Sequence, residues 1–254
     1  MFSSDPYLSQ ALPVDLSLVT TKYHIKHLKS LGIQSENFSI IGGFSLKSLS
    51  VFKNKFSQAD SLEKLQIRKK FKKYICFDYG VVLRGYYTFS EAITLLTFLS
   101  ELCISEDYCL IIKPHPSAKI DKINTFLKSF SSNVFIVNRE SLPYHSINAC
   151  DLLITKYSMI GVDAMIFKKP VISVILDKEL GFKAFRNAAE YVFSIKDLDI
   201  LFKKFKENPD FYENWKNSQL EKSSLHINKI YKSTKIDSYE IAAESIDKLA
   251  KKLN

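Results

Sequence analysis

The sequence predicts an α/β protein in which a parallel, Rossmann-like sheet carries helices on both faces. From residue 74 onward, short apolar runs alternate with amphipathic stretches. Strands and helices that alternate at this spacing form βαβ units, whose right-handed crossovers place helices on both faces of the sheet. The 254 residues are 46% hydrophobic and 25% charged, which are the proportions of a soluble globular protein. No apolar run approaches the roughly 18 residues that span a bilayer.

Residues 1–73 show a looser pattern. The apolar runs at 15–20 and 38–43 predict two strands, and the amphipathic stretch at 22–31 predicts a helix between them. Residues 44–73 are interpreted as a linker that ends in a basic helix. Cations crowd the end of that helix: Lys64, Arg68, Lys69, Lys70, Lys72 and Lys73.

The alternation then predicts each later element in order. Buried strands are expected at residues 74–79, 108–113, 133–137, 151–155 and 170–175. Helices are expected at residues 90–104, 120–130, 142–149 and 158–167, and again from the last strand to the C-terminus. The first of these helices has the clearest pattern, because its apolar residues recur at the spacing of one helical face: Ala92, Leu95, Leu96 and Leu99.

The composition excludes several function classes. Seven glycines leave no Gly-rich phosphate loop of either common type. The four cysteines lack paired or metal-ligand spacing, so we expect buried thiols and no disulfide or metal. The net charge of +9 attracts nucleic acid or anionic lipid without selectivity, and no nucleic-acid recognition motif accompanies it. Because the N-terminus also lacks a signal-peptide pattern, we expect a cytoplasmic protein without a cofactor or a specific nucleic-acid partner.

Ligands of open parallel sheets bind beyond the carboxyl ends of the strands, so the residues that follow each strand are the candidates. After the strand at 108–113, Lys113-Pro114-His115-Pro116 holds a histidine between two prolines. A histidine fixed there can donate to a phosphate or act as a general base, and Lys113 stands two residues away. The alternative is a structural turn in which His115 caps the next helix.

Two further strands contribute weaker candidates. Arg84, which follows the strand at 74–79, is either a bidentate phosphate clamp or a solvated loop arginine. Asp78, at the end of that strand, is a candidate base. Tyr144 and His145, ahead of the strand at 151–155, are lower-ranked candidates for the same crevice.

The strand at 151–155 ends in Thr155-Lys156-Tyr157-Ser158, and Ser158 falls where the next helix is expected to begin. A serine there is a natural N-cap, while its hydroxyl and the free backbone N–H groups can also hold a phosphate. Asp163 follows about one turn later among apolar residues. These neighbours favour a ribose acceptor over a solvent-facing helix residue.

The segment from residue 150 to residue 172 resembles the C-terminal, donor-binding domain of GT-B glycosyltransferases. It is most similar to the branch that includes CDP-glycerol glycerophosphotransferases and capsule polysaccharide enzymes. The residues that keep the spacing of that motif are Tyr157, Ser158, Asp163, Lys169 and Pro170. The segment Lys113-Pro114-His115-Pro116 is similar to the His-Pro motif of the same families. Two departures are Lys156, which replaces an acidic residue, and Met159, which replaces a second serine.

The resemblance implies a metal-independent transfer of a sugar or polyol phosphate from a nucleotide-activated donor of the CDP, CMP or UDP type, in surface polysaccharide biosynthesis such as that of a capsule. It assigns catalysis to His115 and the donor ribose to Asp163. It assigns the donor phosphates to five residues: Arg84, Lys113, Thr155, Tyr157 and Ser158.

The beginning of the chain resembles the last part of a GT-B N-terminal domain. The expected division is a remnant or end of that acceptor domain at 1–50, a basic linker or helix at 51–73 and the donor-binding domain at 74–254, with most of the N-terminal domain missing. The alternative to an active transferase is therefore a non-catalytic nucleotide-binding partner subunit, or a remnant of a split enzyme, that needs an N-domain partner chain. An active enzyme would meet its acceptor by peripheral contact with anionic lipid at the inner membrane face.

Overall fold

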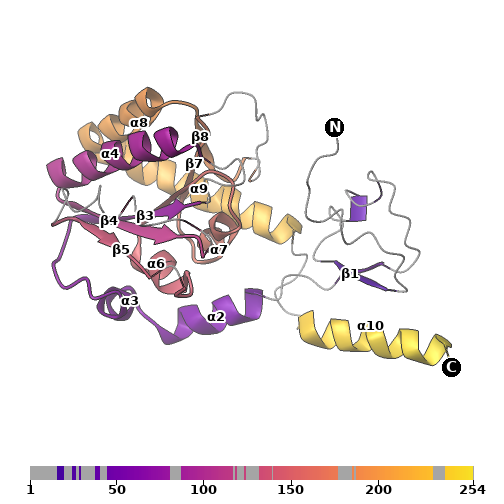
Figure 1. The fold of residues 1–254 in the computed structure, drawn as a ribbon. Helices are drawn as coiled ribbons and strands as arrows, with labels where there is room; N and C mark the ends of the chain where they lie inside the picture. Colours follow the sequence, from indigo (N-terminus) through magenta and orange to yellow (C-terminus); the bar gives the residue numbers. More distant parts are fainter. Residues whose placement is uncertain are drawn as a thin grey trace. The chain divides into compact units, whose positions relative to one another are not determined.

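The contacts between residues divide the chain into two units: residues 49–226 form one, and residues 1–48 with 227–254 form the other. The larger unit contains the predicted parallel sheet, drawn in Figure 1 with its helices. The computed structural model describes residues 16–19, 25–26, 29, 38–40, 45–80, 87–116, 118, 123, 132–138, 140–176, 185, 187–230 and 238–253.

Six parallel strands form the sheet of the larger unit, in the order β5-β4-β3-β6-β7-β8. They are β3 (Lys73–Tyr79), β4 (Tyr108–Pro114), β5 (Val134–Ile136), β6 (Leu152–Thr155), β7 (Val171–Val174) and β8 (Glu190–Val192). From β3 the chain moves outward through β4 to β5, then crosses back to β6 and moves outward on the other side. The strand order therefore reverses between β3 and β6, which is where sheets of this kind bind ligands.

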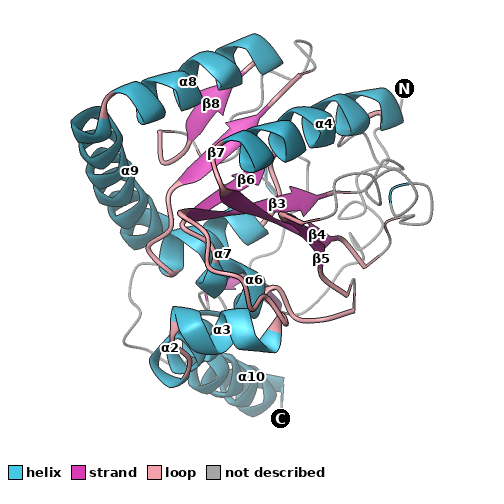
Figure 2. Ribbon diagram, turned by 90° about the vertical axis from the view of Figure 1, so that its left-hand side faces the viewer, coloured by secondary structure: helices cyan, strands magenta, loops and turns pink. Residues whose placement is uncertain are grey.

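Helices cover both faces of this sheet, as Figure 2 shows. One face carries α4 (Phe89–Ser105) and α8 (Ile195–Glu207), and the other carries α6 (Tyr144–Ala149) and α7 (Ile160–Ile166). The other described helices with residues in this unit are α3 (Gln58–Lys64), which packs on α6, and α2 (Ser45–Lys55) and α9 (Pro209–Ile230), which both cross the boundary of the unit. The α/β class with helices on both faces is thereby confirmed.

The main core lies between the sheet and the helices α4 and α8. Ile75, Phe77 and Tyr79 of β3 point into it, together with the predicted apolar face of α4. Because side chains alternate along a strand, Cys76 and Asp78 point to the opposite face of the sheet. The residues of that opposite face are the ones that position the candidate site.

A capping box fixes the start of α4. The Thr88 hydroxyl accepts a hydrogen bond of 3.2 Å from the Glu91 N–H, and the Glu91 carboxylate accepts one of 2.7 Å from the Thr88 N–H. This reciprocal pair satisfies two backbone N–H donors at the helix terminus. The Thr-x-x-Glu spacing was visible in the sequence, although the predicted helix relied on its apolar face alone.

Two predicted elements of the larger unit are wrong in part. Residues 190–192, expected to be helical, form β8 beside β7, because three residues are too few to show a strand period. The cationic segment after Lys64 is not helical, because α3 ends there and Gln66 takes a positive φ of 60°. Arg68, Lys70 and the other cations therefore lie in the connection to β3 or at its start.

The smaller unit contains a parallel pair, β1 (Ser17–Val19) and β2 (Phe38–Ile40), which confirms both early strands. The hydroxyls of Ser39 in β2 and Ser245 in α10 (Ser238–Leu253) hydrogen-bond at 2.6 Å. Contacts of this kind group the C-terminal helix with the first residues of the chain, whereas the sequence-based division placed it in the domain at 74–254.

Several other expectations concern the chain as a whole. Most residues of the helices expected at 22–31 and 120–130 lie outside the described part of the chain. All four cysteines are buried and free, as predicted. In the described ranges, no helix combines the length and apolarity that crossing a membrane requires.

Candidate functional site

Four polar side chains form a row across the sheet at the carboxyl ends of its central strands, and we call them the polar row. Lys113 of β4 is in register with Asp78 of β3, and Thr155 of β6 is in register with Ser173 of β7. The pairing of β3 with β6 makes Asp78 and Thr155 neighbours too. All four residues are at most 5% exposed. Buried polar groups are costly unless they are paired, so such a row in an apolar sheet indicates a built site.

Asp78 is the centre of the polar row. Its Oδ2 accepts a hydrogen bond of 2.9 Å from Thr155 Oγ1, and the nearby Ser158 hydroxyl favours the charged form of the carboxylate. Burial raises the pKa of Asp78 to about 6, and the hydrogen bonds from the two hydroxyls and the charge of Lys113 oppose that rise. The carboxylate therefore ties β3 to β6 and to the segment that follows β6.

Lys113 supplies the positive charge beside Asp78. Burial lowers the pKa of Lys113, and the charge of Asp78 opposes that effect. The Nζ atom donates a hydrogen bond of 3.0 Å to the Pro114 carbonyl. The ammonium group thus lies beneath the strand ends and acts on the site through its charge.

His115 follows Lys113 at the end of β4 and is exposed. Its N–H donates to the Tyr79 carbonyl at 3.0 Å, and its carbonyl accepts from the Ala118 N–H at 2.9 Å. The backbone of His115 is thereby tied to the end of β3, the strand next to which the strand order reverses. The fixed backbone that the two prolines predict is present, with the imidazole on the solvent side.

The segment between β6 and α7 is tied down at successive residues. The Lys156 side chain is buried, with its ammonium 5.1 Å from the centre of the Tyr87 ring and 5.6 Å from that of Tyr157. The Ser173 hydroxyl of the polar row donates to the Lys156 carbonyl. Cations stack favourably on aromatic faces, so Lys156 holds Tyr157 at the mouth of the site.

Ser158 is not the N-cap that the sequence predicted. The helix α7 begins at Ile160, and its N-cap is Met159, which provides no side-chain hydrogen bond. The Ser158 hydroxyl accepts a hydrogen bond of 3.5 Å from the Ile160 N–H, at the limit of such a bond.

Asp163 lies half-buried on α7, between the buried residues Val162 and Ala164. Burial raises the pKa of Asp163 to about 6. Among the residues that the structure describes, none gives its carboxylate a hydrogen bond. A half-buried carboxylate to which no described residue donates is suited to accept hydrogen bonds from a ligand hydroxyl.

The structure brings together most of the predicted site. Lys113, His115, Thr155, Tyr157 and Ser158 all lie at the carboxyl ends of β4 and β6, on either side of β3. Asp78 joins them and was predicted only as a candidate base; its signal was an acid at the end of an apolar strand. Arg84 lies outside the described residues.

Tyr144 and His145 belong elsewhere. The His145 ring lies 4.7 Å from the Phe52 ring and 5.0 Å from the Phe56 ring, and its Nδ1 is 3.3 Å from Ser61 Oγ. The Tyr144 ring also packs on Phe52, at 5.5 Å. The expectation that these two face the polar row is therefore wrong, because the apolar sides of α2 and α3 hold them.

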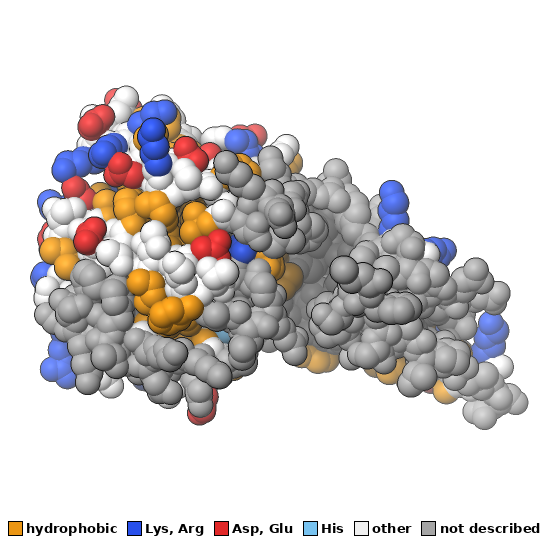
Figure 3. Space-filling model, turned by 45° about the horizontal axis from the view of Figure 1, so that its top comes forward, with side chains coloured by type: hydrophobic (Ala, Val, Ile, Leu, Met, Phe, Trp, Pro, Cys, Tyr) orange, Lys and Arg blue, Asp and Glu red, His pale blue; other side chains and the backbone are white. Residues whose placement is uncertain are grey.

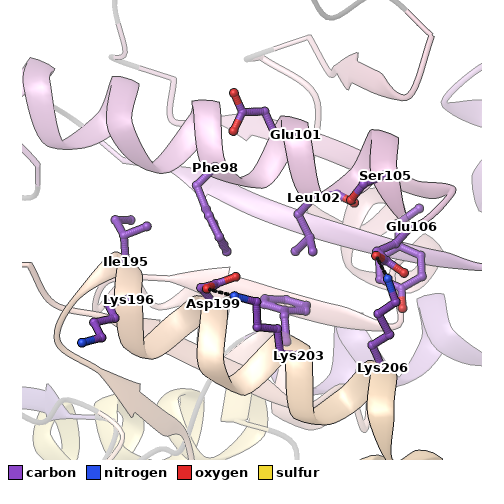
Figure 4. Close-up of a pocket in the computed structure, with 12 residues that line it drawn as sticks. Phe98, Glu101, Leu102, Ser105, Glu106, Ile195, Lys196, Asp199, Lys203 and Lys206 are labelled. Carbon is purple, nitrogen blue, oxygen red and sulfur yellow. Dashed lines mark hydrogen bonds and ion pairs between the residues drawn. The ribbon is translucent and has the colours of Figure 1, made fainter.

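A separate groove of about 700 Å³ lies between α4 and α8 (Figure 4). Figure 4 shows Phe98 and Leu102 of α4 pointing toward α8. Ion pairs of 2.7 Å join Lys206 to Glu106 and Lys203 to Asp199 at its rim. Figure 3 shows hydrophobic side chains gathered among charged ones on the larger unit. The groove reaches Tyr108 at the amino end of β4, so it is distinct from the polar row.

The larger unit has the Rossmann-like α/β fold of GT-B structures. A variant of the wall teichoic acid polymerase TagF soaked with CDPG has a TM-score of 0.65 and 16% identity, with 100% of this chain and 62% of that chain covered. The UDP-GlcNAc 2-epimerase of Neisseria meningitidis bound to UDP-GlcNAc has a TM-score of 0.63 and 14% identity, with 98% of this chain and 67% of that chain covered. A glycosyltransferase of Rickettsia africae has a TM-score of 0.53 and 12% identity, with 90% of this chain and 64% of that chain covered.

Residues 72–188 match the family model of CDP-Glycerol:Poly(glycerophosphate) glycerophosphotransferase. This segment contains the whole polar row, His115 and Asp163. No curated protein matches the sequence. The matched segment is therefore similar to CDP-glycerol glycerophosphotransferases, as the resemblance predicted, and the chain spans 62% of the length of the TagF chain.

Proposed function

We propose that this chain binds a CDP-activated polyol such as CDP-glycerol and transfers the polyol phosphate to an acceptor hydroxyl during the synthesis of a surface polymer. The observation that carries the proposal is the polar row, which stands at the reversal of strand order inside the segment that matches the glycerophosphotransferase family. A nucleotide donor is the ligand class that such a crevice accommodates.

The donor would lie across the ends of β3, β4 and β6. We assign its phosphates to Ser158 and Tyr157 on one side and to Lys113 on the other, with Arg84 as a further clamp, while the buried Thr155 holds Asp78 in place. We assign the ribose to Asp163, whose carboxylate accepts hydrogen bonds from hydroxyl groups. Cations around a diphosphate stabilise the negative charge that develops on the leaving nucleotide.

His115 is the catalytic residue in this proposal. The acceptor hydroxyl oxygen attacks the phosphorus that carries the polyol, the bond from that phosphorus to the oxygen of the nucleoside phosphate breaks, and CMP leaves. The proton of the acceptor hydroxyl passes to the imidazole, which is exposed and therefore accessible to an acceptor. No cofactor takes part in this scheme.

Cytoplasmic location and a lipid-linked acceptor belong to the same proposal. Arg68, Lys70 and Lys72 are exposed on the connection between α3 and β3. Basic side chains of this kind attract anionic lipid head groups, which is where the acceptor of a growing capsule or wall polymer would be found. An N-domain partner chain could complete the acceptor side.

The test combines binding and transfer. Calorimetric titrations of the purified chain with CMP, CDP, UDP and GDP, followed by CDP-glycerol, should give selective binding of the cytidine ligands. Release of CMP from CDP-glycerol in the presence of a polyol-phosphate acceptor should then be lost in His115→Asn. Selective binding without CMP release under any acceptor condition would favour the non-catalytic subunit. Equal affinity for all four nucleotides, or none, would overturn the proposal.

A further inference from the structure

A lysine side chain is buried directly beyond the carboxyl end of β6. Lys156 is 2% exposed, although lysine is among the residue types that are least often buried. We propose that Lys156 is a specificity-determining residue of the donor site, whose buried ammonium makes the site prefer a nucleoside diphosphate over the same nucleoside with one phosphate or none. The proposal rests on the proposed function, because it takes the phosphates of the donor as the ligand.

The ammonium of Lys156 lies on the face of the sheet that α4 and α8 cover. Side chains alternate along β6, so that Ile154 points into the main core and Thr155 points to the face of Asp78. Lys156 continues this alternation, and its Nζ is 5.1 Å from the centre of the Tyr87 ring, which belongs to the same core. The lysine therefore reaches the strand ends from the side opposite to the polar row.

Lys113 brings a second buried ammonium to the same edge from the other face. It lies at the end of β4 in register with Asp78, and it is 4% exposed. Since β4 and β6 are the two neighbours of β3, the lysines lie at the ends of the strands that flank β3, one on each face of the sheet. Two cations in this arrangement suit a ligand that carries two linked phosphates better than a ligand that carries one.

Contacts at both ends of Lys156 fix its position. The ammonium is 5.1 Å from the centre of the Tyr87 ring and 5.6 Å from that of the Tyr157 ring. The Tyr87 hydroxyl donates a hydrogen bond of 3.0 Å to the Val174 carbonyl, which fixes that ring in turn. At the backbone, the Lys156 carbonyl accepts a hydrogen bond from the Ser173 hydroxyl. The charge therefore has a defined place at the strand ends.

Burying a cation at this position is costly to the fold. Aromatic faces return only part of the hydration that a buried ammonium loses. Methionine fills a similar volume without that cost, and apolar replacement of buried ions often leaves a protein equally or more stable. A buried cation at a ligand-binding edge is suited to attract a ligand of opposite charge. The attraction is strong where water is excluded, and it grows with the charge of the ligand, so it favours a diphosphate over a monophosphate.

The sign of this charge distinguishes the chain from the motif that it resembles. Lys156 stands where that motif has an acidic residue. An acid directly before Tyr157 would repel a phosphate, whereas the ammonium attracts it. The preference for a diphosphate is therefore expected from a residue particular to this chain.

Calorimetric titrations of the full chain with cytidine, CMP and CDP test the preference. The wild type should bind CDP most tightly and cytidine least tightly. Lys156→Met keeps the length of the side chain and removes its charge. Its affinity for CDP should fall by about tenfold and its affinity for CMP by less, while its affinity for cytidine should not change. Lys156→Arg, which keeps the charge, should retain a preference for CDP over CMP.

Two further measurements separate this role from a structural one. Urea denaturation should show Lys156→Met to be as stable as the wild type or more stable, because an apolar side chain replaces a buried ion. Lys204→Met is the matched control: Lys204 is exposed on α8, and its Nζ is 5.9 Å from the centre of the Phe211 ring. That variant also loses one charge and one cation–ring contact, and it should leave all three affinities unchanged.

Three results of these titrations contradict the inference. Equal losses of affinity for cytidine, CMP and CDP in Lys156→Met would mean that Lys156 only holds Tyr157, and unchanged affinities would mean that it has no role. If Lys156→Met fails to fold, Lys156→Gln decides instead, because it keeps a hydrogen-bonding end without the charge. An unchanged preference for CDP in that variant overturns the inference.

Inorganic phosphate and pyrophosphate distinguish a failure of this inference from a failure of the proposed function. Absence of cytidine selectivity overturns the proposed function. The ratio of the pyrophosphate and phosphate affinities still decides the role of Lys156, since this ratio should be lower in Lys156→Met than in the wild type. An equal ratio in both overturns the inference, even where CDP binds selectively. Absence of binding to every probe overturns both.

Discussion

Thr155 Oγ1 donates a hydrogen bond of 2.9 Å to Asp78 Oδ2, and this bond joins β6 to β3 where the strand order of the sheet reverses. The two strands belong to different halves of the sheet, so a side-chain link between them fixes the crevice at their ends. The Thr155 side chain is fully buried, which makes its contribution structural rather than a direct contact with a ligand.

Thr155→Val tests the strength of this link. The isosteric methyl removes a hydrogen bond to a charged group, so we expect a loss of about 1.5–3 kcal/mol in the free energy of unfolding at pH 8. At pH 5 the Asp78 carboxyl is protonated, since its pKa is raised to about 6, and the loss should be smaller. Urea denaturation at both pH values measures this, with Thr155→Ser as the control that keeps the hydroxyl. A loss of equal size at pH 5 and pH 8 would show that only packing is involved.

Asp163→Asn should stabilise the protein while it weakens nucleotide binding. Because burial raises the pKa of Asp163 to about 6, the folded state holds the proton more tightly than the unfolded state does. The contribution of this carboxyl to the free energy of unfolding therefore falls as the pH rises from about 4 to 6, and it stays low above that.

The amide variant avoids that penalty, so it should be more stable than the wild type by about 1–2 kcal/mol at pH 8 and no more stable at pH 4. Its affinity for cytidine nucleotides should fall by about tenfold if the carboxylate holds the ribose, which corresponds to 1.4 kcal/mol. Thermal denaturation and calorimetry provide the two measurements. Reduced stability at pH 8 would contradict the assigned environment, and unchanged affinity would contradict the ribose role.

Much of the fold could be predicted because the central strands are buried on both faces. Such strands appear as continuous apolar runs, and β3, β4, β6 and β7 were predicted to within one residue at each end. The short strand β8 could not be predicted, because three residues show no period and its formation depends on pairing with β7. Local sequence patterns could not predict the division into two units either, because one unit combines residues from opposite ends of the chain.

Only the residues of the site that directly follow a predicted strand could be placed from the sequence. His115 and Ser158 follow predicted strands directly, so their place at one edge of the sheet follows from the topology. The hydrogen bond between Thr155 and Asp78 depends on the pairing of β3 with β6, which the sequence pattern does not specify. Because Asp78 joins the site through this pairing, the sequence analysis ranked Asp78 too low.

His115→Asn should abolish transfer and leave the fold intact. The side chain is exposed, so the free energy of unfolding should change by less than about 0.5 kcal/mol. Loss of a general base lowers the rate of the chemical step by about 10²–10⁴-fold. Single-turnover release of CMP from CDP-glycerol measures the rate, and near-wild-type affinity for CMP confirms that the site is formed. Transfer at the wild-type rate would remove His115 from the mechanism.

Lys168→Gly should stabilise the end of α7. Lys168 is exposed and has a positive φ of 58°, where a Cβ atom costs about 1–2 kcal/mol. Its N–H donates to the Met165 carbonyl at 3.0 Å, so the turn that requires this conformation is formed. The flexibility of glycine in the unfolded chain offsets about 0.4–1 kcal/mol. We therefore expect a net gain of about 0.5–1 kcal/mol by urea denaturation. Lys168→Ala, which keeps the Cβ atom, should show no gain, and a gain of the same size would refute the explanation.

Gly161→Ala sets local helix propensity against a tertiary contact. In an isolated helix alanine is favoured over glycine by about 1 kcal/mol. In this structure a Cβ atom at residue 161 would lie 2.5 Å from Cζ of Phe185, whose ring is 1% exposed. The Phe185 N–H also donates to the Tyr191 hydroxyl at 2.8 Å, which holds the backbone of this residue in place.

Overpacking of this kind costs about 1–3 kcal/mol, which exceeds the gain in propensity. We therefore expect Gly161→Ala to lower the free energy of unfolding, by urea denaturation, and Phe185→Leu in the same chain to recover part of the loss. Phe185→Leu alone is the control, because a double-mutant cycle then isolates the contact between the two residues. If Gly161→Ala were instead stabilising, the Phe185 ring would not lie against α7, and the packing that holds Asp163 in place would have to be different.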